Sequence, residues 1–367
     1  MTHPDIIVIG GGIAGISAAA ELAAHARVTV IEAEAQLGYH ATGRSAAIFI
    51  RNYGNSTLRA LNAAAAPVFE APEGISDRSL LSPRGELLLA GEDELAAFDA
   101  YCDGATGIDL LEPADAVALV PILRPERIAR AALERDAQDI DVDRMLQGYA
   151  RLLKARGGQV VAGAPVTAIR RGHAAWQVTV ADTPFTAPVV VNAAGAWADT
   201  VARLAGLPPL GITPMRRSAA LLPAPAGHDI TRWPLFGSIS ETWYAKPDAG
   251  KLMVSPADED PVEPHDAWPD DMVLAEGLDR YQQAVTVPVT RVEHSWAGLR
   301  SFAPDRTPVV GSAPDVDGFF WLAGQGGYGV QTAPALARLT AALVTGGEPG
   351  LSDATVAALS PARFHSS

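Results

Sequence analysis

Short apolar runs and a glycine-rich turn alternate over the N-terminal part of the chain. Residues 5–9 (DIIVI) form a run of apolar, mostly β-branched side chains, which is typical of a strand buried on both faces of a parallel sheet. Gly10, Gly12 and Gly15 follow at the spacing G-x-G-x-x-G, and an alanine-rich stretch after them predicts a helix. Residues 27–32 (RVTVIE) predict a second strand. The pattern therefore predicts a βαβ unit whose first turn is made of glycine.

Strand-to-helix units occur twice more along the chain. Residues 188–192 (PVVVN) predict a buried strand before a helix at 196–204, and residues 319–323 (FFWLA) predict a strand that leads through a second glycine cluster to a helix at 331–344. The other expected elements are helices at 55–66, 141–157 and 270–284, a loop leading into a strand at 80–90, strands near 159–170 and 176–181, a loop at 33–54, and strand-rich sequence with many prolines over 210–300.

Nucleotide-type elements thus lie at the start, the middle and the end of the chain, and the stretches between them differ in character. This order predicts a discontinuous dinucleotide-binding domain made of residues 1–52, 137–206 and 298–367. A substrate-binding domain of residues 53–136 and 207–297 would then be inserted in two pieces.

Composition narrows the class of protein. The chain has 367 residues, enough for one large core or two linked cores, and its net charge of −14 argues against nucleic acid and anionic membranes as partners. A single cysteine, Cys102, excludes an internal disulfide and a cysteine-based metal cluster, and no metal site is expected. We find neither a signal peptide nor an apolar run long enough to span a membrane, so we expect a cytoplasmic protein.

The glycine turn has a specific chemistry. In such a turn the first glycine permits a tight bend, the second lets a pyrophosphate approach the backbone, and the third lets the helix pack on the strand. Glu32 ends the second strand, where an acid accepts hydrogen bonds from ribose hydroxyls and repels a 2′-phosphate. A purely structural turn is the alternative, but strand, glycines, helix, second strand and acid all occur in order. We therefore predict a bound dinucleotide other than NADP.

The segment GYHATGRSAA (38–47) resembles the glutathione-reductase-type flavoproteins of the D-amino-acid oxidase family, and most closely the bacterial D-arginine dehydrogenases and related D-amino-acid dehydrogenases. Matching blocks are LLSPRGE (80–86), DIDVDRMLQGY (139–149), VNAAGAWAD (191–199), RRSA (216–219), WAGLRSF (296–302) and GQGGYGVQTA (324–333). The resemblance covers nearly the whole chain. It implies an α/β fold, with a Rossmann-like FAD-binding domain (GR2-type) and a discontinuous α+β substrate domain built on a mostly antiparallel sheet.

The resemblance also implies a set of cofactor contacts. Beside the glycines of the first turn, it assigns Ala14, Glu32 and Ala33 to the adenosine half of FAD, Val166 to the adenine, Ala41, Thr42, Gly43, Arg44, Ser45, Ala46 and Ala47 to the pyrophosphate and flavin, Ala194 and Gly195 to the same site, and Gly326, Gly327, Tyr328, Gly329, Val330 and Gln331 to the isoalloxazine. A helix N-terminus at the second glycine cluster would stabilise the negative charge of a reduced flavin. A structural β–α turn is the alternative there. Cys102 lies outside every such block, so we expect FAD to be bound non-covalently.

For the substrate, the family clamps an amino-acid carboxylate with arginine and tyrosine. By resemblance Arg300, Arg217 and Tyr244 take this role, and the planar fork of arginine matches a carboxylate. Without the resemblance, Arg216 and Arg217 would be interpreted as a solvated surface pair.

Four further residues complete the implied pocket. Tyr53 resembles the family's lid tyrosine, Glu86 aligns with an acid that faces the distal cation in arginine-using relatives, and the carbonyl of Gly327 would accept from the substrate amine. A loop aromatic and an exposed strand end are the alternatives for Tyr53 and Glu86. Ile48 stands where those relatives have histidine, which argues against arginine preference and for an inner pocket that is more apolar.

These residues suggest oxidative deamination of a D-amino acid. Hydride would move from Cα to flavin N5, and water would hydrolyse the imino acid to a 2-oxo acid and ammonia without an essential general base. Oxidation of a secondary amine (as in sarcosine or glycine oxidases) or of a 2-hydroxy acid is an alternative within redox chemistry. A non-redox flavin-binding subunit is an alternative from another class. The sequence leaves open the electron acceptor (a quinone, another carrier or oxygen) and the oligomeric state.

Overall fold

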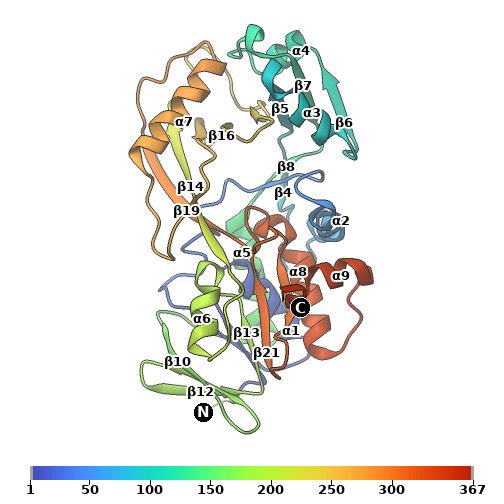
Figure 1. Ribbon diagram of the computed structural model, residues 1–367, viewed down its shortest axis with the longest axis vertical. Helices are drawn as coiled ribbons and strands as arrows, with labels where there is room; N and C mark the ends of the chain where they lie inside the picture. The colour runs from blue at the N-terminus through green and yellow to red at the C-terminus, as the bar shows by residue number, and fades with distance from the viewer. Residues whose placement is uncertain (1–2, 365–367) are drawn as a thin grey trace.

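The computed structural model describes residues 3–364, and Figure 1 shows their two parts arranged along the long axis. The core of one part is a six-stranded sheet among these residues, in the order β20-β21-β13-β1-β2-β9. Its strands are β1 (Ile6–Ile9), β2 (Val28–Ile31), β9 (Gln159–Val161), β13 (Val189–Asn192), β20 (Val309–Ser312) and β21 (Phe319–Ala323). All neighbours pair in parallel except β20, which runs antiparallel to β21 at the edge.

Both faces of this sheet are covered, which explains the continuous apolar runs of its strands. Ile6 and Val8 of β1 join a core with α1 (Ile13–Leu22), α5 (Val142–Ala155) and α8 (Gly329–Thr345). Ile7 and Ile9 point to the other face and join a second core. That face is covered by the three-stranded antiparallel sheet β10 (Val166–Arg171), β11 (Trp176–Val180) and β12 (Thr183–Ala187), and by α6 (Ala198–Leu204).

The other part is built on a nine-stranded sheet within the described residues. Eight strands follow the order β18-β14-β17-β16-β15-β5-β7-β6, and the ninth, β19, pairs with β14 outside this order. Its strands are β5 (Glu86–Ala90), β6 (Ile108–Leu111), β7 (Arg130–Glu134), β14 (Thr213–Leu222), β15 (Leu235–Ser238), β16 (Tyr244–Asp248), β17 (Lys251–Ser255), β18 (Asp260–Pro261) and β19 (His294–Phe302). β15 and β5 pair in parallel and the other neighbours are antiparallel. The predicted fold class, including the mostly antiparallel sheet, is confirmed.

Helices cover this second sheet. Phe236, Trp243 and Tyr281 belong to its core, and Tyr281 comes from α7 (Asp271–Ala284). The region also holds α3 (Leu95–Cys102) and α4 (Pro113–Leu119), which the sequence analysis did not predict.

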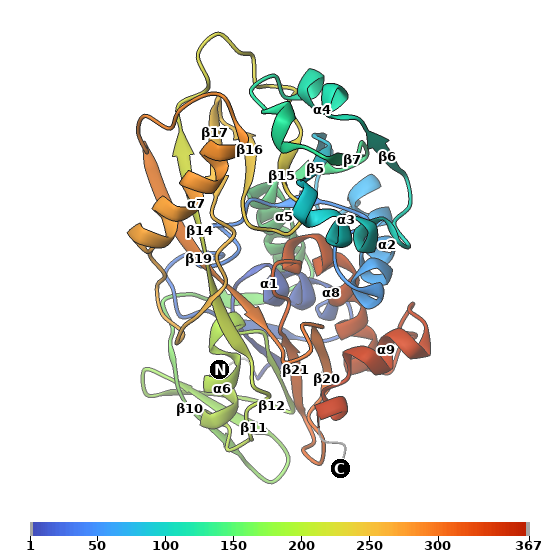
Figure 2. The same ribbon diagram turned by 45° about the horizontal axis from the view of Figure 1, so that its top comes forward.

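Three features join the two parts. β14 and β19 form a long antiparallel pair, in which Thr213 lies opposite Phe302 at one end and Leu221 opposite His294 at the other. Figure 2 shows the two strands running side by side between the parts. A small sheet of β3 (Ile48–Phe49), β8 (Gln138–Ile140) and β4 (Leu81–Pro83) lies between them, and α2 (Ser56–Glu70) packs on α8 and on α9 (Asp353–Leu359). The predicted domain boundary at residues 297 and 298 falls inside β19, so this strand belongs to both parts. In the described part of the chain, no helix is long and apolar enough to cross a membrane.

Candidate active site

A cavity of about 470 Å³ is lined by residues of both sheets. Glu32 and Val166 line it on the side of the first βαβ unit. Arg217 of β14, Tyr244 of β16 and Arg300 of β19 line it as well. The structure therefore brings the predicted dinucleotide residues and the predicted carboxylate clamp into one cavity.

The first glycine turn is shaped by close backbone packing. Gly10 has φ +113°, and a Cβ on it would lie 2.3 Å from the carbonyl oxygen of Ala193. A Cβ on Gly15 would lie 1.9 Å from the carbonyl oxygen of Gly10, so helix α1 can approach the strand only with glycine there. Gly12 differs, because a Cβ on it would meet only Thr42 Oγ1, at 3.3 Å, in the lining of the cavity.

A second open position faces the same cavity. Gly195, which follows β13, lines the cavity, and no atom of the described residues lies within 4 Å of a Cβ added to it. Together with Gly12 it leaves a cradle of bare backbone beside the N-terminus of α1, and such a cradle suits the pyrophosphate of a dinucleotide. The residues present therefore fit FAD.

Glu32 and Thr42 hold the walls of this cradle. The carboxylate of Glu32 accepts from the backbone N–H of Gly11 through one oxygen and from that of Glu34, at 2.8 Å, through the other. Thr42 Oγ1 accepts from the N–H of Ile13, at 3.0 Å, in the first turn of α1. These bonds fix the strand end and the 38–47 loop against the glycine turn.

Arg44 has a different environment from the one expected. It lines the cavity, but its guanidinium donates to the carbonyls of Tyr39 (3.2 Å), Ala267 (3.1 Å) and Ala297 (3.0 Å) and forms an ion pair with Asp266. Its positive charge is thus engaged by protein groups on the 38–47 loop, on β19 and on the segment before α7. This arrangement is that of a clamp for the loop.

Most of the other predicted cofactor residues also line the cavity: Gly10, Ala14, Ala33, Ala41, Ser45, Ala46, Ala194, Gly326, Gly327, Gly329 and Val330. Gly15, Gly43, Ala47, Tyr328 and Gln331 do not line it. Gly43 donates its N–H to the carbonyl of Gly38 (2.7 Å) and closes a turn. The Gln331 amide is directed away, because it accepts from the N–H of Ile50 (3.1 Å) and donates to Asn62 Oδ1 (2.8 Å).

Arg300 lies directly against the second glycine cluster. A Cβ on Gly327 would be 2.8 Å from Nη1 of Arg300 and 3.0 Å from Cζ, so only glycine lets the guanidinium lie there. Burial alone would lower the pKa of Arg300, but Tyr53, Tyr244 and nearby carboxylates raise it above its usual range. Arg300 is therefore a permanent cation at the surface of the cavity.

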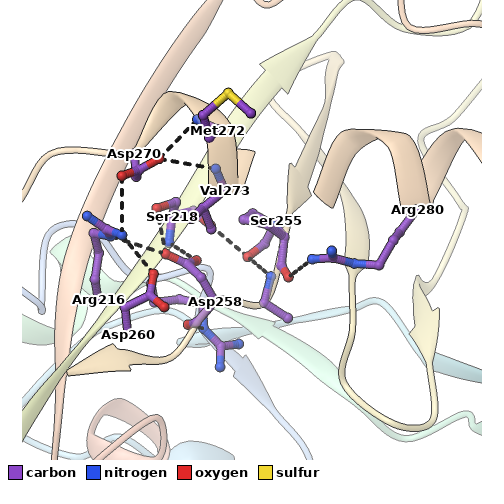
Figure 3. Close-up of polar contacts among 12 residues, drawn as sticks. Arg216, Ser218, Ser255, Asp258, Asp260, Asp270, Met272, Val273 and Arg280 are labelled. Atoms are coloured by element: carbon purple, nitrogen blue, oxygen red, sulfur yellow. Dashed lines mark hydrogen bonds and ion pairs between the residues drawn. The ribbon is translucent and has the colours of Figure 1, made fainter. Parts of the chain in front are cut away.

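Arg217 is held by a buried network on the loop that precedes β18. Its Nε donates to the carbonyl of Asp258 (2.8 Å) and its Nη2 to Glu259 (2.9 Å). The Asp258 carboxylate in turn accepts from the N–H (2.6 Å) and hydroxyl (2.8 Å) of Ser218 and lies 3.6 Å from Nε of Arg216, as Figure 3 shows. Arg216 and Arg217 are both largely buried, which corrects the interpretation of a solvated surface pair.

Two tyrosines flank the arginines with opposite pKa shifts. Burial would raise the pKa of Tyr244, but the charges of Arg300 and Arg217 outweigh it and lower the pKa below its usual value. Burial raises the pKa of Tyr53, whose ring packs on that of Tyr328 with centroids 4.9 Å apart. Tyr53 does not line the cavity itself, but it lies near enough to Arg300 for the arginine charge to oppose part of the rise in its pKa.

The remaining predicted pocket residues lie outside the cavity lining. Glu86 is 8% exposed and sits opposite Glu134 in the β5–β7 pair. Burial, with the charge of Glu134, raises its pKa well above the usual value. Ile48 lies in β3, opposite Asp139.

Sequence reasoning missed several residues of this region. Glu241 has φ +52° in the turn between β15 and β16, and its charge acts on Tyr53, Glu86 and Arg300. His40 and Trp197 line the cavity with ring centroids 4.6 Å apart. No local pattern marks Glu241, whereas His40 and Trp197 stood inside the matching blocks. The described residues contain no group of three or more His, Cys, Asp or Glu that could hold a metal.

Comparisons with known proteins agree with a cavity that fits FAD. The family model for FAD-dependent oxidoreductases (DAO) matches residues 5–343, so the chain belongs to this family and FAD is its cofactor. The chain is 27% identical to FAD-dependent oxidoreductase domain-containing protein 1 of Bos taurus, over 94% of this chain and 81% of that protein. It is 25% identical to the mitochondrial sarcosine dehydrogenase of Homo sapiens, over 65% of this chain and 28% of that protein. The crystal structure of glycine oxidase from Geobacillus kaustophilus superposes with a TM-score of 0.84 at 22% identity, covering 99% of both chains.

Proposed function

We propose that this FAD-dependent oxidoreductase converts a D-amino acid to a 2-oxo acid and ammonia. The position of Arg300 carries the proposal, because its guanidinium lies across Gly327 in the cavity that Arg217 and Tyr244 also line. Two fixed cations and a phenol in one place suit a substrate carboxylate. The resemblance of the sequence to D-amino-acid dehydrogenases supports the D configuration.

The chain's own residues bind and orient in this proposal. Arg300, Arg217 and Tyr244 bind the substrate carboxylate, and the carbonyl of Gly327 accepts from the substrate amine, so that Cα is held in one orientation. The amine must be neutral for its lone pair to assist loss of hydride from Cα. Bound FAD supplies the two-electron acceptor. Water then adds to the imino acid and ammonia leaves, and no side chain has to act as a general base.

Two residues, Ile48 and Glu86, support a proposal about the side chain of the substrate. Ile48 replaces the histidine of the D-arginine dehydrogenases that the sequence resembles. Glu86 is buried and lies opposite Glu134 in the β5–β7 pair. Burial and the charge of Glu134 raise the pKa of Glu86 and so disfavour a full negative charge that would bind a distal cation, and we propose an apolar or mixed side chain in place of arginine.

A second candidate is the oxidation of glycine or of an N-methyl glycine. The similarity to a sarcosine dehydrogenase and to the fold of a glycine oxidase favours this candidate. The same arginines would bind the carboxylate of such substrates or of a 2-hydroxy acid.

Anaerobic mixing of the FAD-loaded protein with a substrate panel separates these candidates. The panel holds D- and L-amino acids, glycine, sarcosine and 2-hydroxy acids, and bleaching of the flavin absorbance is measured. Bleaching by D-amino acids and not by their L forms is the expected result. Bleaching by glycine or sarcosine alone would select the second candidate, and bleaching by a 2-hydroxy acid alone would reject both candidates. No bleaching at all would point to a non-redox flavin-binding subunit. Admission of air then shows whether oxygen accepts the electrons.

The mode of FAD attachment has its own test. Cys102 ends α3 and does not line the cavity, so we propose that FAD is held without a covalent bond. Precipitation with trichloroacetic acid should leave a colourless pellet, and a yellow pellet would contradict the proposal. The cytoplasmic location stays a prediction from the sequence.

A further inference from the structure

The segment that carries Tyr53 has an unusual set of hydrogen bonds. Residues 50–54 form no helix or strand, yet side chains of other elements bond their backbone. Asn62 of α2 points its Nδ2 at the carbonyls of Ile50 (3.2 Å), Arg51 (3.4 Å) and Tyr53 (3.2 Å). One side chain thus binds three of the four carbonyls from Ile50 to Tyr53.

Two other elements bond the same segment. Gln331, in the first turns of α8, accepts from the N–H of Ile50 (3.1 Å) and donates to Asn62 Oδ1 (2.8 Å). Glu134 of β7 accepts from the N–H of Arg51 (2.7 Å) and from Nδ2 of Asn52 (2.6 Å). Residues from α2, α8 and β7 therefore meet at one irregular stretch of chain.

Burial makes this network specific. Asn62 is 0% exposed, Gln331 and Glu134 are 3% exposed, and Asn52 is 4% exposed. A buried polar network whose members are all bonded favours one arrangement, because any displacement leaves a desolvated group without a partner. The backbone that carries Tyr53 is therefore held in one place, which differs from a freely moving lid.

We propose that Asn62 is a positioning residue that sets the place of Tyr53 relative to Arg300 and Tyr328. Through Gln331 it also ties the Tyr53 segment to the start of α8, directly after the glycine cluster of Gly326 and Gly327. The proposal rests on the proposed function in one respect, namely that Arg300, on which Tyr53 acts, binds the substrate carboxylate. Asn62 itself does not line the cavity.

The test uses Asn62→Ala in the FAD-loaded protein, with steady-state kinetics on the substrate that bleaches the flavin. KM should rise about tenfold, the size of one hydrogen bond to a charged or polar group, while kcat changes less than about twofold, since ground-state and transition-state binding are lost together. An unchanged KM in a folded protein would overturn the proposal.

Asn55→Ala is the matched control. Asn55 caps the same helix by accepting from the N–H of Leu58 (3.0 Å) and donates to Thr307 Oγ1 (3.0 Å), but it bonds none of residues 50–53. Its loss should lower the melting temperature and leave KM unchanged. An equal rise of KM in both variants would mean that loss of helix α2 stability is the cause, and would overturn a role specific to Asn62.

A double-mutant cycle tests whether Asn62 acts through Tyr53. In a Tyr53→Ala background, Asn62→Ala should add less than about twofold to KM. The same tenfold rise in both backgrounds would overturn the proposal. If Asn62→Ala does not fold, Gln331→Met removes the amide bonds to Asn62 and Ile50 at similar size and takes its place in the cycle.

Hydrogen exchange separates this inference from the proposed function. Asn62→Ala should speed amide exchange in residues 50–54, whatever substrate the protein uses, and Asn55→Ala should not. Unchanged exchange in 50–54 would overturn the inference even if D-amino acids bleach the flavin. Faster exchange without any bleaching would leave the positioning of the segment supported and the proposed function rejected.

Discussion

Arg300 shows how much of the candidate site depends on single contacts. Its guanidinium fits because residue 327 lacks a side chain, and the phenols of Tyr53 and Tyr244 favour its charge. Lysine would keep the charge but not the planar fork that matches a carboxylate.

We therefore expect Arg300→Lys to lower kcat/KM for the carboxylate substrate by about a hundredfold, or about 2.7 kcal/mol. Arg291→Lys is the control, because this exposed arginine precedes the same strand and, within residues 3–364, forms an ion pair with Glu293 alone. Steady-state kinetics check both variants. A loss smaller than about threefold would show that the carboxylate binds elsewhere.

The contact between Arg300 and Gly327 can also be tested by changing the glycine. The Cβ of alanine would lie 2.8 Å from Nη1 of Arg300, so the guanidinium has to move. Gly327→Ala should raise KM by about tenfold or more, with FAD content measured in parallel from the absorbance spectrum. Normal KM with full FAD content would mean that Arg300 has room to shift without cost.

Glu86 predicts a pH dependence of stability. Burial, followed by the charges of Glu134 and Glu241, raises its pKa in the folded protein above the usual value of 4.5. The folded state therefore holds this proton more tightly than the unfolded state. The stability from this group is complete below about pH 4.5 and is lost as the pH rises through the raised pKa.

Glu86→Gln removes that ionisation. The melting temperature of Glu86→Gln minus that of the wild type should increase as the pH rises from 4.5 towards 9. Scanning calorimetry in a pH series measures this difference. Glu92→Gln, on the exposed turn after β5, is the control and should follow the wild type. A constant difference between Glu86→Gln and wild type across the range would show that Glu86 ionises normally.

At the scale of elements, the local pattern of apolar residues predicted the buried strands and the long helices. Strands β1, β2, β13 and β21 and helices α1, α5 and α7 lie within a few residues of their predicted places. Each is a continuous apolar run or a long amphipathic stretch with a clear end. Helices α3 and α4 were missed, because eight and seven residues are too short for a helical period to show.

The 38–47 loop is the element on which FAD binding should depend. Arg44 holds it with three carbonyl bonds and the ion pair to Asp266. Arg44→Gln should weaken FAD binding by about tenfold, measured by quenching of flavin fluorescence on titration of the apoprotein. Asp266→Asn should weaken it by less than about threefold, because this pair is partly exposed. Tighter FAD binding by Asp266→Asn would instead mean that Asp266 withholds Arg44 from the pyrophosphate.

At the scale of the whole molecule, the cavity depends on both parts. Gly12 and Gly195 follow strands β1 and β13 of the six-stranded sheet, whereas Arg217 and Tyr244 lie in strands of the nine-stranded sheet, and β19 joins the two. A ligand that fills the whole cavity should therefore stabilise both parts together.

FAD at one hundred times its Kd should add about 2.7 kcal/mol to the free energy of unfolding. Calorimetry of the apoprotein with added FAD should show a rise of several degrees in a single transition. ADP, which carries only the adenosine half, should stabilise less at the same multiple of FAD's Kd. Two transitions, of which FAD shifts only one, would contradict the coupling of the two parts.

The sequence by itself determined the dinucleotide turn, because the spacing of glycines between a β-branched strand and a helix sets the backbone geometry within one βαβ unit. The resemblance extended this to FAD and to nearly half of the residues that line the cavity. Only the tertiary structure decided that the Arg44 guanidinium clamps a loop, that Gln331 turns towards Asn62, and that Glu241 and Glu134 act on Tyr53 and Glu86. These contacts join residues far apart in the chain, and their distances follow from the packing of two sheets, which no local pattern of residues records.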